Sequence, residues 1–431
     1  MIATVKTKTR SPLLQKQVLS WALYDWANSA FAATVMVVFF PVFFKQYWSA
    51  GVSATQSTFW LGMTNGTASF LLAIMAPLLG ALGDRGGSRL RFLLAFTVLG
   101  VVSTAGLSLV GQGQWQWAAV LFALASMGFW GGIIFYDSLL LDVAPRDRLD
   151  SISGWGYAVG YLGGGVLLAI NVWMTLDPGF FGLADATAAV RASFVTVAVW
   201  WALFAVPIFL FVRERGAGQR VAVGAAKTLR ESFAELMKTV REVRRYRAVV
   251  FFLLAYWMYI DGVNTIQKMA VDYGLAIGLE TSSLIQAILM VQFIGFPAAL
   301  LFGWLGQRIS PVVGIFICIA VYTAVTIYAT MLNTSTEFFI MAAATGCVQG
   351  GVQSLSRSYY GRLIPQDRAG EFYGFYNMMS KFAAVLGPFL MGITALLTGN
   401  SRMAILSIVV LFIGGAVLLV IAARREHAVV A

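Results

Sequence analysis

Two acidic residues in apolar stretches are the first candidates for chemistry. Asp25 and Asp261 are each followed three positions later by an asparagine, Asn28 and Asn264. This spacing places carboxylate and amide on one face of a helix. Such a face can hold an ammonium group or a proton. The alternative is a polar face that joins neighbouring helices through hydrogen bonds.

Two lysines also lie in apolar stretches. Lys268 follows Asp261 by seven residues, two helical turns, and so lies on a similar face. Lys381 is a candidate partner for a substrate carboxylate or phosphate, and alternatively a structural partner of Asp261. A charge in hydrocarbon costs about 2.5–3.5 kcal/mol on insertion scales and usually faces a cavity, which favours functional roles for such residues.

A polar stripe is expected along one further helix. Gln349, Gln353 and Arg357 are spaced four residues apart and therefore share a helix face. This stripe is a candidate for recognition of a polar substrate, and Arg357 can grip a carboxylate with two parallel hydrogen bonds. Hydrogen bonding between helices is the alternative role for the two glutamines.

The composition shows which elements must position these residues. The chain has 431 residues, of which 59% are hydrophobic and 11% charged. A soluble protein is typically about 45–50% apolar and about 25% charged. The composition therefore excludes a soluble enzyme and a disordered chain and indicates an integral membrane protein. Twelve apolar runs are long enough to span a bilayer as helices: about 18–47, 57–82, 91–111, 116–143, 152–175, 191–212, 248–273, 283–306, 311–331, 335–363, 371–398 and 402–423.

The basic residues predict the orientation of these spans. With the N-terminal side called inside, 24 of the 30 lysines and arginines fall in inner segments and three in outer loops. This bias predicts that both termini are cytoplasmic. It also explains the net charge of +11 without nucleic acid. Within the basic loop 213–247, residues 229–243 have the spacing of an amphipathic surface helix.

The chain reads as a duplication. The sequence GALGDR at 80–85 is matched by GWLGQR at 303–308, and PRDR at 145–148 by PQDR at 365–368. Both halves start on the same side, so the repeat is parallel, as in large secondary transporters that bind substrate between their halves. We therefore predict an all-α membrane protein of two six-helix bundles. Its predicted parts are a first bundle at 1–212, a cytoplasmic linker at 213–247 and a second bundle at 248–431.

The repeat also pairs an acid with a base. At the offset of 220 residues that relates the second pair of loops, Arg357 corresponds to Asp137. Equivalent positions of two halves approach each other near the pseudo-twofold axis. Asp137 and Arg357 are therefore expected to pair across that axis and to close the cytoplasmic side of a central cavity.

A charged loop after the second span is a candidate gate. Its residues can pair with helix ends in one conformation and release them in another. Asp142 and Asp150 are candidate partners for its arginines. The gating set comprises Gly80, Gly83, Asp84, Arg85, Arg89, Asp142, Asp150 and, from the second-half copy, Arg308.

These motifs resemble a known family. The loop with Gly80 and Arg85 resembles the cytoplasmic loop motif of the major facilitator superfamily. The sequence WALYDWANSAF at 21–31 resembles the opening signature of its vacuole-effluxer-like branch, which includes autophagy-related amino-acid permeases, and residues 349–357 and 371–377 resemble later signatures. The short tails and loops resemble the bacterial branch, which implies a bacterial cytoplasmic membrane.

The resemblance implies a secondary transporter that works by alternating access as a monomer. The implied cargo is an amino-acid-like zwitterion exported from the cytoplasm, with protons as a candidate coupling ion. A larger amphiphile, such as a lysophospholipid, muropeptide or drug, and a receptor that transports nothing are the alternatives. The single histidine, His427, lies in the C-terminal tail, and we find no catalytic motif. We therefore expect partners only in the substrate, protons and the bilayer, and no metal, cofactor or enzymatic activity.

Overall fold

A computed structural model describes residues 12–84, 89–214, 246–276, 280–332, 334–383, 386–399 and 401–430. The described residues form helices and no strands. Twelve of the segments are long and apolar enough to span a membrane. The predicted all-α class and the twelve spans are therefore confirmed. The amphipathic helix predicted at 229–243 lies outside the described residues.

The helices of the first half follow one another with short connections. The first span continues α1 through π-helical and α-helical turns as one segment from Lys16 to Trp48. The elements are η1 (Pro12–Leu14), α1 (Lys16–Ala30), η2 (Phe31–Phe39), α2 (Phe40–Phe43), η3 (Phe44–Trp48), α3 (Ala54–Asp84), α4 (Arg89–Leu107), α5 (Trp115–Val143), η4 (Arg146–Arg148), α6 (Leu149–Leu176), η5 (Pro178–Phe181) and α7 (Ala186–Phe211).

The second half contains the other six spans. Its eleventh span is divided into α13 and α14, and its twelfth into α15 and α16. The elements are α9 (Arg247–Ala276), α10 (Thr281–Arg308), α11 (Pro311–Ala329), α12 (Ser335–Leu363), η6 (Gln366–Arg368), α13 (Ala369–Phe382), α14 (Leu386–Thr398), α15 (Ser401–Leu406) and α16 (Val409–Val430).

Local capping explains several helix starts. Asp185 accepts a 2.7 Å hydrogen bond from the N–H of Ala188 at the start of α7. Thr334 and Glu337 form a reciprocal capping box at the start of α12. The sixth span therefore begins at Ala186, five residues before the predicted start, because the polar cap extends the helix beyond its apolar run.

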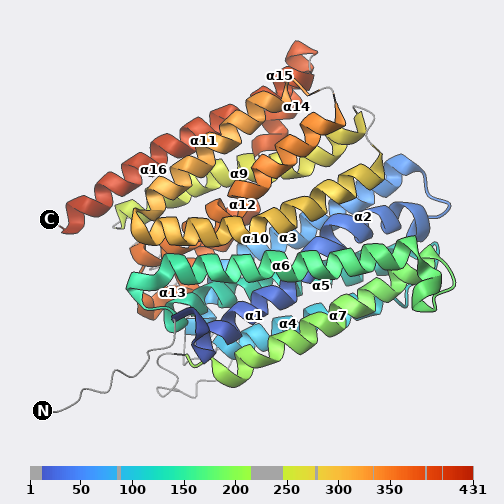
Figure 1. Ribbon diagram of the computed structural model, residues 1–431, viewed down its shortest axis with the longest axis horizontal. Helices are drawn as coiled ribbons and strands as arrows, with labels where there is room; N and C mark the ends of the chain where they lie inside the picture. The colour runs from blue at the N-terminus through green and yellow to red at the C-terminus, as the bar shows by residue number, and fades with distance from the viewer. Residues whose placement is uncertain are drawn as a thin grey trace, which may run out of the picture.

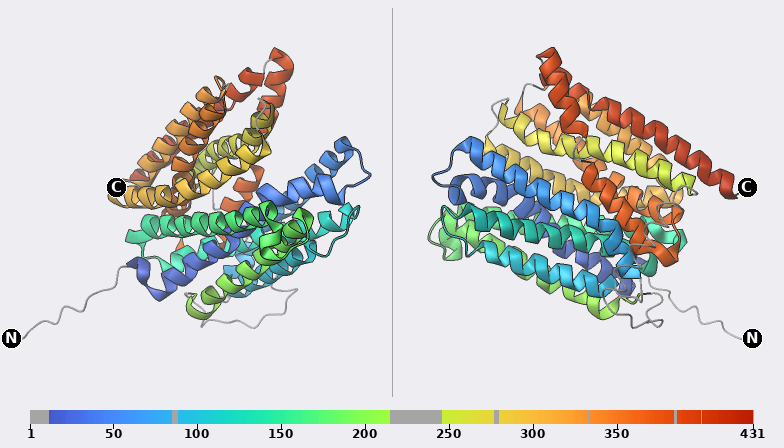
Figure 2. Two further views of the ribbon diagram at one scale, coloured as in Figure 1. Left: turned by 45° about the vertical axis from the view of Figure 1, so that its right-hand side comes forward. Right: turned by 180° about the vertical axis from the view of Figure 1, so that it is seen from behind.

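The two halves meet mainly along five helices. α3 packs against α13, and α6 packs against α10 and α12. Figure 1 shows α1–α7 on one side of the molecule and most of the second-half helices on the other, with α13 lying beside the first half. α1 begins and α16 ends at the same end, which we call the α1–α16 end. The two groups of helices converge at this end and diverge toward the opposite, far end (Figure 2).

Candidate functional site

Arg357 of α12 lies at the centre of the contact between the halves. Its side chain is 1% exposed and reaches into the first half. Nε donates to the hydroxyl of Ser153 at 3.0 Å, and Nη2 donates to the Ser153 carbonyl at 3.0 Å. Nη1 donates to Oδ1 of Asp137 at 3.1 Å. The pairing of Asp137 with Arg357 expected from the repeat is therefore confirmed, whereas its closing role stays a prediction.

A second carboxylate approaches the same guanidinium. Oδ2 of Asp25 lies 3.9 Å from Nη1 of Arg357, beyond hydrogen-bonding distance. Tyr136 donates its hydroxyl to Oδ2 of Asp25 at 3.1 Å, and Ser29 donates to Oδ1 at 3.4 Å. A carbon at the Cβ position of Gly160 would lie 3.1 Å from the Asp25 carboxyl carbon, so α6 packs closely against Asp25.

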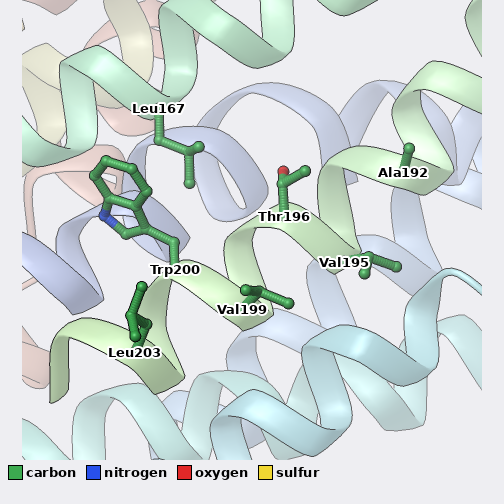
Figure 3. A pocket seen from close by; sticks show the side chains of 7 residues that line it. All are labelled: Leu167, Ala192, Val195, Thr196, Val199, Trp200 and Leu203. Carbon is green, nitrogen blue, oxygen red and sulfur yellow. The ribbon is translucent and has the colours of Figure 1, made fainter. Parts of the chain in front are cut away.

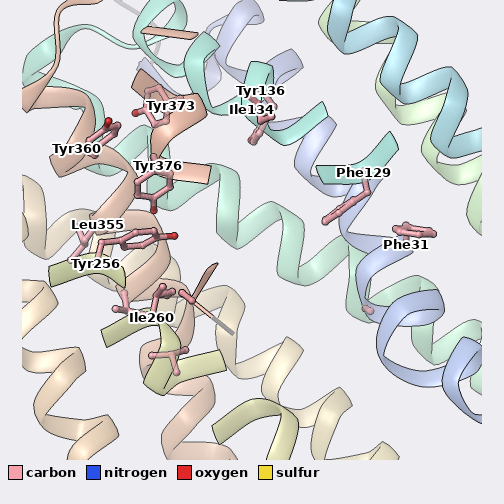
Figure 4. Packing of buried hydrophobic residues seen from close by; sticks show 14 of the residues in the cluster. Phe31, Phe129, Ile134, Tyr136, Tyr256, Ile260, Leu355, Tyr360, Tyr373 and Tyr376 are labelled. Carbon is pink, nitrogen blue, oxygen red and sulfur yellow. The ribbon is translucent and has the colours of Figure 1, made fainter. Parts of the chain in front are cut away.

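Aromatic rings enclose this charged cluster. The guanidinium carbon of Arg357 lies 4.9 Å from the ring centre of Trp21 and 4.2 Å from that of Tyr157. Such faces attract a cation, more so when water is excluded. On the second-half side, Tyr256 and Tyr376 stack at 4.2 Å between ring centres. Figure 4 shows these two rings beside Tyr360 and Tyr373. The rings shield the ion pairs from water on both sides.

Gln353 of the polar stripe also contacts the first half. Oε1 of Gln353 accepts a 2.9 Å hydrogen bond from the hydroxyl of Tyr161 on α6. Gln349, one turn earlier on α12, is half-buried. Both glutamines therefore lie farther from the α1–α16 end than Arg357.

Asn28 is buried, and neither of its amide atoms has a hydrogen-bond partner among the described residues.

Asp261 holds a different kind of position from Asp25. Its carboxylate accepts N–H groups from Leu386 at 2.9 Å and from Gly387 at 3.0 Å, at the start of α14. Asn264 donates to the carbonyl of Ala383, just after the end of α13, at 2.9 Å. A divided helix leaves backbone groups without partners inside its own span. Asp261 and Asn264 supply hydrogen-bond partners for these backbone groups. This is the alternative role predicted for such a polar face, that of joining neighbouring helices.

The two intramembrane lysines are placed unequally. The Lys381 ammonium lies over the ring of Trp130 on α5 and so links the halves by a cation–π contact. The side chain of Lys268 lies outside the described part of the structure. The roles in substrate or proton binding predicted for these lysines, for Asp261 and for Asn264 stay predictions.

Residues of the predicted gate join α3 to α13 at the α1–α16 end. The Asp84 carboxylate accepts the N–H groups of Gly370 and Glu371, both at 2.8 Å, at the first turn of α13. Negative charge is favoured there because helix N-termini present free N–H groups and a partial positive charge. A Cβ on Gly80 would collide with the backbone of Gly370, so glycine permits this approach.

Arg89 holds the loop side of this gate. It pairs with Asp142 of α5 at 2.8 Å, which confirms one predicted partner. It also lies 3.8 Å from both Asp84 and Glu214. A Cβ on Gly83 would meet the ring of Phe135 at 2.6 Å. Arg85 lies outside the described residues.

The pseudosymmetric contact between α6 and α10 differs in its charges. Gln307 stands where the first half has Asp84, and it bonds the Asp147 carbonyl and the Ser151 hydroxyl. Asp150 was predicted to serve the arginines of the first-half loop. It accepts from Ser358 of α12 at 2.6 Å and pairs with Arg362. The first turn of α6 therefore faces the second half, and because Arg85 lies outside the described residues, the predicted pairing of Asp150 with the loop arginines stays a prediction. Arg308 is exposed and lies over Trp304 of its own helix, away from this contact.

Comparison with known proteins identifies the family. The family model described as vacuole effluxer Atg22-like matches residues 14–148 and 141–429. The chain belongs to this family. It is 38% identical over 412 residues to the uncharacterized MFS-type transporter YxiO of Bacillus subtilis (strain 168), covering 94% of each chain. It is 23% identical to autophagy-related protein 22 of Coccidioides immitis (strain RS), covering 88% of this chain and 82% of that one.

Solved structures share the fold. The human organic anion transporter MFSD10 (TETRAN) matches with a TM-score of 0.69 at 15% identity, over 95% of this chain and 99% of that one. The proton:xylose symporter XylE matches with a TM-score of 0.68 at 13% identity, over 93% of each. This Atg22-like protein is therefore a major facilitator transporter, an integral membrane protein that carries small molecules by secondary transport, and not an enzyme.

Several residues of this Atg22-like site escaped the sequence analysis. Glu214 caps the start of α4 by accepting N–H groups from Arg89 and Leu90 at 3.1 and 2.8 Å. Ser153 offers Arg357 a hydroxyl and a carbonyl. Asn377, inside a motif quoted for the resemblance, donates to Asp137 at 3.1 Å. Serine and asparagine in an apolar helix give no signal of a partner in another half, so only that motif could have drawn attention to Asn377.

An apolar groove lies on the outer surface of the transporter. It runs between α6 and α7, and Figure 3 shows its lining. The polar groups shown are the hydroxyl of Thr196 and the indole N–H of Trp200, which donates to the carbonyl of Trp26. The lining residues are Leu167, Ala192, Val195, Thr196, Val199, Trp200 and Leu203. Such a surface suits an acyl chain and offers no partner for a charged solute.

Proposed function

We propose that this transporter exports a small zwitterionic solute of the amino-acid class, coupled to protons, by alternating access. The observation that carries the proposal is the buried bridge of Arg357 to Asp137 and Ser153. This bridge joins the halves at one end through groups that must separate when that end opens. An ion pair that is bound in one state and broken in the other provides two discrete arrangements.

The basic residues support an orientation for this cycle. From their bias toward one side we assign the α1–α16 end to the cytoplasm. That end is closed by Asp84 on α13 and Asp150 on α12. The structure then corresponds to the state that faces outward. The moving bodies are the segments 1–212 and 248–431, joined by the linker 213–247, and the membrane is the bacterial cytoplasmic membrane.

Polar side chains between the halves support a charged or zwitterionic cargo. Gln349, Gln353 and Lys381 come from the second half, and Tyr161 from the first. Amides and a phenol can orient a solute by hydrogen bonds, and an ammonium can pair with its carboxylate. We assign substrate recognition to this set and gating to the contacts nearer the α1–α16 end.

The test is proton flux in proteoliposomes that contain a trapped pH dye. Amino acids, dipeptides and lysophospholipids are added one at a time. We expect an amino-acid-class compound to change the internal pH, and Arg357→Gln to abolish the response. Arg308→Gln is the matched control, because Arg308 is exposed and outside the contact between the halves. Silence with every compound contradicts coupled export and favours a receptor.

A larger amphiphile is the second candidate cargo. The apolar groove between α6 and α7 favours it, since an acyl chain can lie there. A response to lysophospholipid alone, weakened by Thr196→Arg in the groove, would replace the amino-acid proposal. A response to amino acids that Thr196→Arg leaves unchanged would retain it.

A further inference from the structure

The buried cluster around Arg357 contains unequal charges. Asp25 and Asp137 come from the first half and Arg357 from the second. Their exposed fractions are 6%, 3% and 1%. Among the described side chains, the ionisable groups within electrostatic reach of Asp25 are Arg357, Asp137, Tyr24, Tyr136, Tyr157 and Tyr161. Tyrosine is neutral near pH 7. Two carboxylates therefore share one cation.

The hydrogen bonds assign that cation to Asp137. Nη1 of Arg357 bonds Asp137 at 3.1 Å, and Asn377 donates to the other oxygen of Asp137 at 3.1 Å. Nε and Nη2 are used by Ser153. Within the described part of the chain, the hydrogen-bond donors to Asp25 are two neutral hydroxyls, those of Tyr136 and Ser29. Asp25 is thus the carboxylate in excess.

The cation nearest to Asp25 is hydrogen-bonded to Asp137 and lies 3.9 Å from Asp25. A buried carboxylate in this position takes up a proton, because burial disfavours the charged form and the second acid opposes it. We propose that Asp25 carries the transported proton, bound while Arg357 is held by Asp137 and released when the α1–α16 end opens. This inference rests on the proposed coupled transport. In the loaded state the O–H on Oδ1 of Asp25 donates to the Ser29 hydroxyl, and Tyr136 still donates to Oδ2.

Opening supplies the release step. Arg357 belongs to α12 and its acidic partners to α1 and α5, so separation of the halves withdraws the guanidinium from both acids. Water then reaches Asp25, the O–H bond breaks, and the proton passes to water at that end. Closure from the deprotonated state would bury two carboxylates against one arginine, which disfavours it until a proton or the ammonium group of the cargo neutralises Asp25.

Infrared spectroscopy of the reconstituted protein tests the assignment without any substrate. The C=O stretching band of a protonated carboxyl group is recorded at neutral pH in wild type and variants. We expect Asp25→Asn to remove one such band. Asp137→Asn should remove the same band, because Arg357 is then free to neutralise Asp25. Band retention in Asp25→Asn, or in Asp137→Asn, overturns the proposal.

Two milder variants locate the proton on one acid. Tyr136→Phe removes a donor to Asp25 and should shift the band, whereas Asn377→Ala removes a donor to Asp137 and should leave it in place. A band that shifts in Asn377→Ala and not in Tyr136→Phe places the proton on Asp137 and overturns the assignment. A band that neither variant shifts also overturns the assignment. The infrared experiment measures no transport. If the spectra agree with the expected changes but the protein moves no solute, only the proposed function is contradicted.

Discussion

The two acid–amide motifs have similar sequences and different surroundings. Asp25 on α1 reaches toward Tyr136 and Arg357, so it joins the contact between the halves. Asp261 on α9 stays within its own half and caps the start of α14. Asn264 bonds the carbonyl of Ala383, whereas Asn28 has no partner among the described residues.

The helix opposite each motif accounts for the difference. At the repeat offset of 220 residues, Ala383, just past the end of α13, corresponds to Gly163 in the unbroken helix α6. Gly160 and Gly163 let α1 approach α6 closely, with Asp25 and Trp26 against the glycines. The interior of an unbroken helix has no free N–H groups, so Asp25 accepts hydrogen bonds from side chains instead. A duplicated motif therefore need not keep its role.

The largest expected effect is at the bridge that only the first motif joins. Arg357→Gln leaves Asp25 and Asp137 buried without a cation. Breaking a buried ion pair in this way costs about 3–5 kcal/mol. We expect a large loss of thermal stability together with loss of transport, measured by scanning fluorimetry and by the proteoliposome assay. An unchanged melting temperature would show that the bridge is not closed in the membrane.

The second prediction sets the two acids against each other. Asp261→Asn removes the charge that caps α14, and cap substitutions cost about 0.5–2 kcal/mol. Asp25→Asn keeps the shape of an acid that we infer to be protonated and should change stability by less. Paired thermal melts check this order. If Asp25→Asn lowers the melting temperature more than Asp261→Asn does, Asp25 is ionised and the inferred protonation of Asp25 is wrong.

The third prediction contrasts a cap within one half with a cap between halves. Asp84 caps α13 from the first half, as Asp261 caps α14 from the second. Charge–dipole contacts of this kind contribute about 0.3–1 kcal/mol. Asp84→Asn should therefore leave the fold intact and favour opening at the α1–α16 end. We expect Asp84→Asn to speed the labelling of a cysteine introduced at Ser354, a residue that is buried at the α6–α12 contact. Gln307→Ala is the companion variant.

The smallest effect concerns the two amides. Asn264→Ala leaves the carbonyl of Ala383 without its partner, and a buried hydrogen bond contributes about 1 kcal/mol. Asn28→Ala removes an amide that has no partner among the described residues and should be close to neutral. Equal losses of melting temperature for both would indicate that Asn28 binds water or substrate in the membrane.

Much of the architecture was predictable because it depends on local composition. Apolar runs of about twenty residues must be helical in a bilayer, since backbone groups find no other partners there. Asp137 and Arg357 were also predictable as a pair, because a repeat brings equivalent positions together at its axis. The partner of Asp150 was not, since several arginines lie near the same membrane face and only packing selects Arg362.

The residues by themselves determined the twelve spans, the duplication and the buried charges, because each follows from composition, spacing or internal similarity. Tertiary structure alone decided how those charges are divided. The division of the eleventh span at Phe382 and Leu386 assigns Asp261 to a helix start, and the unbroken α6 leaves Asp25 beside Arg357. Backbone N–H groups carry no sequence signal, so the partners of Asp84 and Asp261 emerge only when helices from distant parts of the chain pack together.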